Sequence, residues 1–438
     1  MSTTYLNKTL GSGNRDKWTW SAWVKKHSNG SILPLFHADD GSSNYYTHIS
    51  FHDTDQLFFQ NRYANTNKGY KISTQVFRDN NAWYHVQFVW DSNNSTADDR
   101  QIIYVNGERI TAYDVNITPN LDQNSTINDG YEHRIGRGGT GFNGSAYANV
   151  TLSHVHFADG QALAPTVFGS TDNVTGQWKI NTSPSFTLGT NGFTILKDGN
   201  TITDQSANSN NWTLGGGTLT NTEDCPSNVF ATLNPLAIFG GNSNPVLERG
   251  NTVLNTSGNN ANKGLFLSTL GMTQGSGKFY CEVKATEATR LTVGVCNKNV
   301  FLSSTSPDSL TNQAAIGYWY SGHVYYDNNG NVSGGSTYTN GDILGIALDM
   351  ENYRLFFHKN GTYMNSGDPT SSTGNVLTFT NATQYLTDHE EMFFFVSDTS
   401  GTGAAIASCN FGNGYFGTQQ ISSEGTNASG IGKFEYDV

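Results

Sequence analysis

The chain has 438 residues, enough for two or three ordinary domains, and its composition favours folded β-structure over disorder or long helices. Aromatic residues make up 12% of the sequence and charged residues only 14%, whereas disordered chains are poor in aromatic residues and rich in charge. With 24 Lys and Arg against 36 Asp and Glu, the net charge is −12. Because an acidic surface repels phosphate backbones, we expect no nucleic-acid partner.

The sequence also argues against membrane insertion and against structural disulfides. No apolar segment approaches the length that crosses a bilayer, and the N-terminal residues contain no apolar leader segment. The four cysteines, Cys225, Cys281, Cys296 and Cys409, lack C-x-x-C spacing, and the last three lie in apolar, strand-like runs. We therefore expect no membrane insertion, and free, buried thiols of the kind found in proteins that fold in a reducing cytoplasm.

The first 160 residues read as a series of short strands. Residues 17–26 alternate, with Trp18, Trp20, Ala22 and Val24 on one face and mostly polar side chains on the other. Residues 81–91 repeat this pattern, and residues 148–160 indicate a further strand. The alternation predicts half-buried strands with an aromatic core face.

Turn residues predict where the chain reverses. Asn106-Gly107 lies between two β-rich runs, and both residue types tolerate the positive φ angles of a two-residue type I′ turn. Asn360-Gly361 marks a second hairpin of this kind. Pro165 is suited to open a short helix, because its missing N–H is not needed in the first helical turn.

Proline spacing divides the chain into three parts. Five of the nine prolines lie between residues 165 and 245, and proline cannot donate to a central β-ladder. After this zone eight short strand-like runs follow at regular spacing. We therefore predict a β-sandwich over residues 1–165, a connector with short strands over 166–234, and a second sandwich over 235–438.

The segments also resemble known families. KWTWSAWVKK, NAWYHVQFVWD, RQIIYVNGERI, HRIGRG and LSHVHFADGQALAP resemble the laminin-G-like, concanavalin-A-like domain of structural proteins from tailed bacteriophages, particularly marine and cyanobacterial ones. TNGFTIL, NSNNW and CPSNVFATLNPL resemble the connector that follows it there. GKFYCEVKA, GDILGIALDM and LFFHKNGTY resemble a SPRY domain.

This resemblance implies an all-β protein of two concanavalin-A-like jelly-roll sandwiches in tandem, laminin-G-like and then SPRY-like. It implies a virion protein, assembled in the host cytoplasm and released by lysis, with other virion proteins as partners and a homo-oligomeric state within the virion. The first predicted strand comes almost directly after Met1, which favours a compact appendage over a long fibre.

Carboxylate spacing favours a non-enzymatic protein. Glycosidases of concanavalin-A-like fold place their acid and their nucleophile or base on one strand face, and the spacing Glu-x-Asp-x-x-Glu is absent from the sequence. Asp349 and Glu351 are two residues apart but precede a turn, where solvated acids are common. His389, Glu390 and Glu391 are expected to provide loop polarity.

Two groups of residues have metal-ligating chemistry, each with a simpler alternative. His154 and His156 share a strand face and would bind a metal if His85 supplied a third ligand; the alternative is packing of half-buried imidazoles. Asp39 and Asp40 are suited to calcium at a sandwich rim, but no further ligands are evident. The glycine-rich residues 136–144 lack the helix that a phosphate loop needs. We expect no metal site and no cofactor.

The strongest binding feature is the aromatic run AAIGYWYSGHVYYDNNG at 314–330. Flat rings stack on sugars or on partner side chains, and nearby Asn and Asp can bond to hydroxyl groups. The alternative is that these rings pack in the core. The predicted ligand-binding residues are Tyr318, Trp319, Tyr320, Tyr325 and Tyr326.

Three functions remain open. The first is a non-enzymatic virion surface protein of the tail fibre or adhesin type that attaches to host surface polysaccharide. The second is a structural protein for capsid decoration or tail assembly, without a host ligand. The third is a glycan depolymerase, which the carboxylate pattern disfavours.

Overall fold

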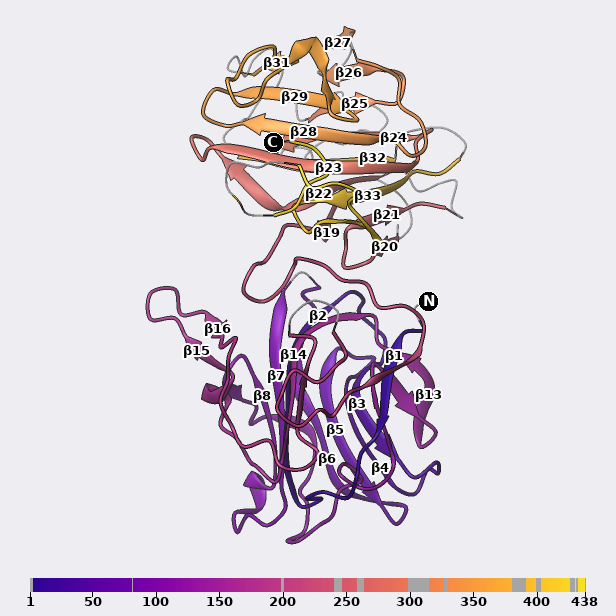
Figure 1. Ribbon diagram of the computed structural model, residues 1–438, viewed down its shortest axis with the longest axis vertical. Coiled ribbons are helices and arrows are strands. Elements are labelled where there is room, and N and C mark those ends of the chain that lie inside the picture. The colour runs from indigo at the N-terminus through magenta and orange to yellow at the C-terminus, as the bar shows by residue number, and fades with distance from the viewer. Residues whose placement is uncertain are drawn as a thin grey trace. The chain divides into compact units, whose positions relative to one another are not determined.

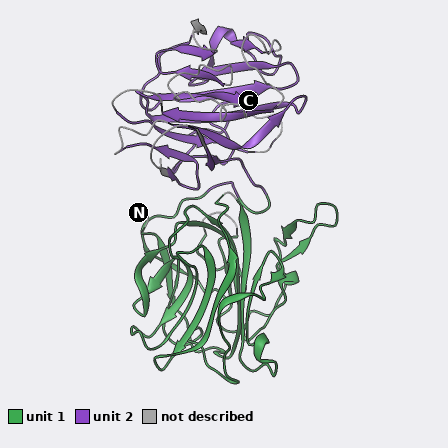
Figure 2. Cartoon of the chain, turned by 180° about the vertical axis from the view of Figure 1, so that it is seen from behind, with its two compact units in different colours: residues 1–221, 225–227 green, residues 222–224, 228–438 purple. Residues whose placement is uncertain are grey.

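The chain divides into two compact units in the computed structural model, residues 1–221 with 225–227 and residues 222–224 with 228–438 (Figure 2). The structure describes residues 3–80, 82–197, 201–239, 246–257, 264–297, 315–326, 330–333, 335–379, 391–398, 403–425, 430 and 432–437. Among these residues, three short 3₁₀ helices accompany the strands: η1 (Ala97–Asp99), η2 (Pro165–Val167) and η5 (Met364–Ser366). No helix in the described part of the chain is long and apolar enough to span a bilayer.

The first unit is a sandwich of two antiparallel sheets (Figure 1). The larger sheet contains, in spatial order, β10 (Tyr113–Ile117), β6 (Thr66–Val76), β5 (Gln56–Tyr63), β4 (Tyr46–Phe51), β3 (Leu33–Asp39), β11 (Glu132–Ile135), β1 (Tyr5–Thr9) and β18 (Thr213–Gly216). The smaller sheet contains β17 (Phe193–Ile195), β14 (Val150–Asp159), β2 (Lys17–Lys26), β7 (Trp83–Asp91), β8 (Gln101–Val105) and β9 (Glu108–Arg109).

Aromatic side chains join the two sheets of this unit. Trp18 and Trp20 on β2 are fully buried, and their rings lie 5.6 Å from Phe59 and 5.9 Å from Phe36 of the opposite sheet. Burying each such side chain contributes roughly 1.5–3 kcal/mol, so this layer is a main source of the stability of the unit. The core face predicted for residues 17–26 is confirmed, because Ala22 is buried in the same cluster, but the strand is not half-buried: its other face, with Thr19 and Ser21, is buried as well.

Residues 166–221, expected to connect two domains, lie within the first unit. β17 pairs with β14, and β18 pairs with β1, so this segment adds a strand to each sheet. The short hairpin of β15 (Gly169–Thr171) and β16 (Trp178–Ile180) stands out from the sheets (Figure 1). Pro165 opens the helix η2, as predicted.

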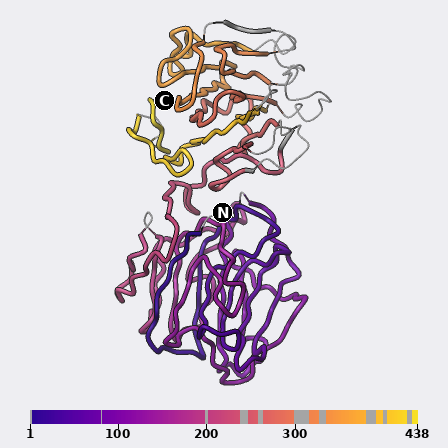
Figure 3. The backbone as a smooth tube through the Cα atoms, turned by 90° about the vertical axis from the view of Figure 1, so that its right-hand side faces the viewer, coloured from indigo at the N-terminus to yellow at the C-terminus, as the bar shows by residue number. Residues whose placement is uncertain are grey.

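The first unit also contains a ribbon that belongs to neither sheet. It consists of β12 (Arg137–Gly139) and β13 (Phe142–Tyr147), which pair only with each other. The backbone course of both units can be followed in Figure 3.

The second unit is again a two-sheet sandwich. One sheet contains β19 (Leu233–Phe239), β22 (Gly264–Thr273), β32 (Glu391–Asp398), β24 (Leu291–Asn297), β25 (Ala315–Trp319), β26 (His323–Tyr326) and β27 (Gly330–Ser333). The other contains β20 (Val246–Glu248), β21 (Val253–Asn255), β33 (Ile406–Asn410), β23 (Lys278–Glu287), β28 (Ile343–Asp349), β29 (Arg354–Lys359) and β30 (Thr362–Tyr363), with β31 (Leu377–Thr378) beside β29; β34 (Tyr415–Phe416) and β35 (Gln419–Gln420) form a separate pair.

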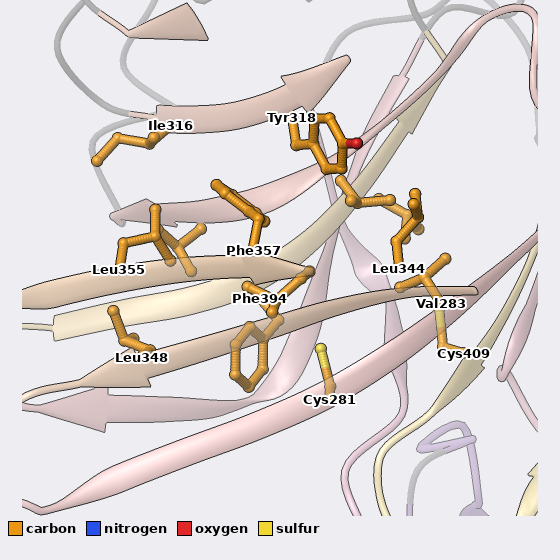
Figure 4. Close-up of a cluster of buried hydrophobic side chains, with 14 of the residues drawn as sticks. Cys281, Val283, Ile316, Tyr318, Leu344, Leu348, Leu355, Phe357, Phe394 and Cys409 are labelled. Carbon is orange, nitrogen blue, oxygen red and sulfur yellow. The ribbon is translucent and has the colours of Figure 1, made fainter. Parts of the chain in front are cut away.

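The core of the second unit is apolar and contains thiols (Figure 4). Tyr318 of one sheet packs on Phe357 of the other, with ring centroids 5.5 Å apart. Cys281 and Cys409 lie in this core, Cys296 is also buried, and all are free thiols. The prediction of two tandem β-sandwiches is therefore confirmed, and so is the expectation of buried free thiols for these three cysteines.

Candidate functional site

Four of the five predicted aromatic residues lie on the antiparallel pair β25–β26, where the register divides them between two faces, and Tyr320 lies in the turn between the two strands. Tyr318 is opposite Val324, Ile316 is opposite Tyr326, and Gly317 is opposite Tyr325. Since successive side chains of a strand point to opposite faces, Tyr318 and Tyr326 share one face, and Trp319 and Tyr325 share the other.

The structure places Tyr318 and Tyr326 against the core. Tyr318 is fully buried, and its hydroxyl donates to the carbonyl of Ser336. Its own carbonyl accepts a hydrogen bond of 3.2 Å from the Tyr338 hydroxyl. Tyr326 is partly buried against the same core cluster. For these two tyrosines the alternative of packing in the core, and not the predicted ligand binding, agrees with the structure.

Trp319, Tyr320 and Tyr325 lie together with His323, and we call these four residues the aromatic surface. The Trp319 ring lies 5.1 Å from Tyr325 and 5.9 Å from Tyr320, and His323 lies 5.9 Å from Tyr325. Tyr320 is exposed and the other three are partly buried. His323 was not predicted, although its place two residues before Tyr325 on a strand puts both on one face.

A group of polar side chains, separate from the aromatic surface, lies on the larger sheet of the first unit, on the face turned away from the core. His37 and Asp39 of β3 lie beside His48 of β4, and all three are buried. His37 Nε2 is 2.8 Å from Asp39 Oδ2, and the two Nδ1 atoms of His37 and His48 are 3.0 Å apart. Arg134 Nη1 donates to the same Asp39 oxygen over 3.1 Å.

These contacts assign the protons along the row. A carboxylate only accepts hydrogen bonds, so His37 Nε2 carries the proton that faces Asp39. The neutral His37 ring then offers Nδ1 as an acceptor, and His48 must donate from its own Nδ1. His48 Nε2 is left as a lone pair, and this buried atom has no hydrogen-bond partner.

Burial and partners set the pKa values of this row in opposite directions. Desolvation lowers the pKa of His37 and takes the pKa of His48 well below the ordinary value of 6.5; the Asp39 carboxylate offsets part of the effect for His37. Burial alone would raise the pKa of Asp39, but His37, Arg134 and the backbone N–H of Gly41 lower it overall. At neutral pH the row therefore holds two neutral imidazoles and one carboxylate.

The ribbon β12–β13 lies over this row, so we call residues 137–147 the cover hairpin. The Phe142 ring lies 4.0 Å from the His48 ring and 5.1 Å from the Phe58 ring, to which it is nearly parallel. At Gly139 an added Cβ would come within 2.0 Å of both Asp39 Oδ2 and His37 Nε2. Glycine at this position therefore lets the hairpin backbone rest directly on the charged row.

The histidines considered for a metal bond to different neighbours. His85 Nδ1 accepts from the Trp178 indole N–H over 3.1 Å, and His85 Nε2 lies 2.8 Å from Ser21 Oγ. His156 Nδ1 is 2.9 Å from Thr194 Oγ1, and His154 Nδ1 is 2.7 Å from Ser153 Oγ. Within the described part of the chain no group of three or more His, Cys, Asp or Glu side chains is arranged to hold a metal.

The acidic candidates also have partners of their own. Asp39 belongs to the row above, whereas Asp40 accepts from the backbone and hydroxyl of Ser42 in a loop. Asp349 is buried and accepts from Asn352, Ser372 and the backbone N–H of Glu351. Glu391 begins β32, while residues 389 and 390 lie outside the described residues.

Comparisons with known proteins agree with the two folds. Residues 2–166 match the family model described as the concanavalin A-like lectin/glucanases superfamily, and residues 278–411 match the model of the SPRY domain. No curated protein matches the sequence.

Solved structures resemble parts of the chain at low identity. The SPRY domain of human HERC1 is 20% identical, covers 40% of this chain and 96% of its own, and superposes with a TM-score of 0.30. Domains LG4-5 of the mouse laminin alpha1 chain are 9% identical over 93% of this chain and 84% of theirs, with a TM-score of 0.31. A putative carbohydrate binding protein from Bacteroides ovatus is 16% identical over 52% of this chain and 59% of its own, with a TM-score of 0.34.

At these identities and TM-scores the solved structures add nothing to what the family models assign. The two models match the two sandwiches in chain order. The chain is an all-β protein with two β-sandwich domains, a concanavalin A-like, laminin G-type domain followed by a SPRY domain.

Proposed function

We propose that the protein is a non-enzymatic component of a tailed-bacteriophage virion surface that attaches to glycans on the host cell. The observation that carries the binding part is the aromatic surface, where three rings and an imidazole lie within 6 Å of their neighbours. Ring faces of this kind stack on sugar rings. The match of residues 2–166 to a superfamily of lectins and glucanases supports a carbohydrate as a ligand of the first domain, whereas the aromatic surface lies in the SPRY domain.

The virion part of the proposal is supported by the sequence segments that resemble phage structural proteins. It implies assembly in the host cytoplasm, release by lysis, other virion proteins as neighbours and several copies of the chain per particle. The non-enzymatic part is supported by Asp349, whose carboxylate is already occupied by Asn352 and Ser372.

The glycan proposal predicts that Trp319→Ala combined with Tyr325→Ala weakens binding to host surface polysaccharide by at least about tenfold, because about 1.4 kcal/mol of stacking is lost. The matched control is Tyr415→Ala, which removes a partly buried ring elsewhere in the second unit and should leave binding unchanged. Affinity is measured by titration calorimetry with purified polysaccharide. Equal binding by both variants would contradict the assignment of this surface.

The virion proposal is tested separately with particles that lack the protein. Such particles should adsorb poorly to host cells. Normal adsorption would contradict a role in host attachment. If the head also carried many symmetric copies of the chain, the result would support a role in capsid decoration instead. Release of oligosaccharides from host polysaccharide would instead show a depolymerase.

A further inference from the structure

The cover hairpin is held to the first domain by side chains and not by the sheets. β12 and β13 bond to each other and to no strand of either sheet. One end is fastened by the Arg137 guanidinium, which lies 4.9 Å from the Tyr5 ring of β1; it also lies 5.4 Å from the Tyr147 ring of the hairpin itself. The other end rests on the sheet through Phe142 and Gly139. Lifting this end breaks no backbone ladder of the sandwich.

The Phe142 ring covers two neighbouring rings on the sheet. The His48 and Phe58 rings lie 5.5 Å apart, Phe142 lies 4.0 Å from the first and 5.1 Å from the second, and Tyr46 lies 6.0 Å away. Ser50 belongs to the same side of β4 as His48, since the two residues are separated by one position on a strand. We call His37, Asp39, His48, Ser50 and Phe58 the covered face.

Two polar atoms of the covered face have no hydrogen bond while the hairpin is closed. They are His48 Nε2 and Ser50 Oγ, and both residues are fully buried. A buried polar group without a hydrogen-bond partner costs about 1–3 kcal/mol. The two unpaired atoms therefore lower the stability of the closed hairpin relative to the open one. An open hairpin would let water or a ligand hydroxyl bond to both atoms.

We propose that the cover hairpin is an acid-released lid, and that the covered face beneath it is a second carbohydrate-binding surface. The sugar assignment rests on the proposed function. It follows from the chemistry of the covered face, which offers two neighbouring rings for a six-membered ring to lie on and presents an acceptor and a hydroxyl beside them. The Phe142 ring occupies that place in the closed protein.

His48 is the group whose protonation opens the lid. In the closed protein its ring lies against Phe142 and Phe58, and its partner is another imidazole, not a carboxylate. The ionisable groups that face it, directly or through His37, are His37 and Asp39 on β3, His52 directly after β4, Arg134 and Glu132 on β11, and the Tyr46 phenol. The cover hairpin itself contributes one charged residue, Arg137, which points to Tyr5 and Tyr147.

The sign of the pH effect follows from proton binding. An exposed imidazole titrates near pH 6.5, whereas closure depresses the pKa of His48 below this value. The open state therefore binds a proton that the closed state rejects. Closure is fully favoured above about pH 6.5, and the open population rises by up to about tenfold for each pH unit below it.

A thiol introduced by Ser50→Cys reports opening, because this position is buried on the same side of β4 as His48 and pairs with Phe58, whose ring Phe142 covers. Its rate of reaction with methyl methanethiosulfonate is measured between pH 7.5 and 5 by peptide mass spectrometry, relative to the urea-unfolded chain at each pH. The control is Thr47→Cys, the neighbouring buried position on the other face of β4. We expect labelling at position 50 to increase in acid, and position 47 to stay protected.

Two further variants connect opening to His48 and to Phe142. In the S50C background, His48→Gln should remove most of the acid response, whereas His52→Gln, at a partly exposed histidine paired with Asp53, should keep it. Phe142→Ala should expose the thiol already at pH 7.5. The lid is overturned if position 50 stays protected at pH 5, if position 47 is labelled in parallel, or if H48Q retains the full response.

The sugar assignment has its own readout. Wild-type chain and F142A are applied to an oligosaccharide array, both carrying W319A and Y325A so that the aromatic surface does not contribute. We expect the chain that retains Phe142 to bind glycans only at pH 5. The F142A chain should bind the same glycans already at pH 7.5. If labelling shows opening but no glycan is gained, the sugar assignment is wrong and the lid stands; neither result depends on the aromatic surface.

Discussion

Glu282 shows how one buried side chain fixes a distant segment. Its Oε1 accepts from the Tyr280 hydroxyl over 3.0 Å and from the backbone N–H of Tyr436 over 2.9 Å. Its Oε2 accepts from Asn410 over 3.2 Å and from the backbone N–H of Glu435 over 2.9 Å. Burial raises the pKa of this carboxyl, and the donors offset part of that rise. The segment near residue 435 is therefore held on the outer face of β23.

We predict that Glu282→Gln destabilises the second domain by about 1–3 kcal/mol, because the amide turns an NH₂ donor toward groups that themselves donate. Urea unfolding of the full chain measures the loss, and hydrogen exchange at residues 435 and 436 should accelerate. Glu287→Gln is the control, because Glu287 is only partly buried and accepts from Thr289 and Asn340 at the surface. A similar loss in both variants would refute the role of Glu282.

Residue-level prediction succeeded where strand alternation alone determines a position. Trp18 and Trp20 follow a period of two and lie in the core. The same pattern could not reveal the row of His37 and His48, because their burial depends on a hairpin about 90 residues further along the chain. His323 was not predicted for a different reason, since the prediction rests on the Tyr and Trp residues of this run and His323 is an imidazole among them.

Hairpins are the elements that the sequence predicts best, because their turn residues carry a local conformational signal. Asn106 and Gly107 have φ angles of 49° and 82°, and Asn360 and Gly361 have 49° and 81°. Both pairs connect antiparallel strands, as expected for type I′ turns. The cover hairpin escaped prediction as a strand pair, since residues 136–144 are rich in glycine and show no alternation.

The turn at Gly107 also supports a tertiary contact. A Cβ at this position would lie 2.4 Å from the Trp178 ring, in addition to the strain of a φ of +82°. Gly30 has a similar φ of +69°, but its Cβ would meet nothing within 4 Å. A substitution at Gly30 therefore measures backbone strain alone, whereas the same substitution at Gly107 measures backbone strain and steric overlap together.

We predict that Gly107→Ala destabilises the first domain by about 1–3 kcal/mol more than Gly30→Ala, because only the former must displace an indole ring. Each substitution also carries about 1 kcal/mol of left-handed backbone strain. Urea unfolding followed by tryptophan fluorescence gives both values. Equal losses in the two variants would mean that Trp178 moves away without cost.

On the scale of the whole molecule, each domain has its own core, and the thiols are distributed unequally between them. Cys281, Cys296 and Cys409 are buried in the second domain, and burial raises the pKa of each thiol. Cys225 is only partly buried. The three buried thiols therefore report on the second domain alone.

We predict that Ellman's reagent labels Cys225 rapidly in the native chain and the other three cysteines only when the second domain unfolds, because a thiolate must be both formed and reached. Labelling is followed against urea concentration beside tryptophan fluorescence. Rapid native labelling of Cys281 or Cys409 would contradict the packing of this core.

The sequence predicted two sandwiches because their strand patterns are strong, but it placed residues 166–221 outside both. Proline and polar residues there suggested a connector, and they do form loops, yet Phe193, Ile195 and Trp212 lie in the first core. Short apolar runs between polar loops give too little periodicity to identify strands that only tertiary packing stabilises.

The position of β18 beside β1 decides how the first domain can be separated from the chain. The family match ends at residue 166, but a fragment cut there would lose β17 and β18 and leave the edges of β14 and β1 unpaired. Unpaired strand edges recruit other chains and promote aggregation. A fragment for expression, or for transfer onto another carrier protein, should therefore extend to residue 221, so that the piece that folds is longer than the piece that sequence families share.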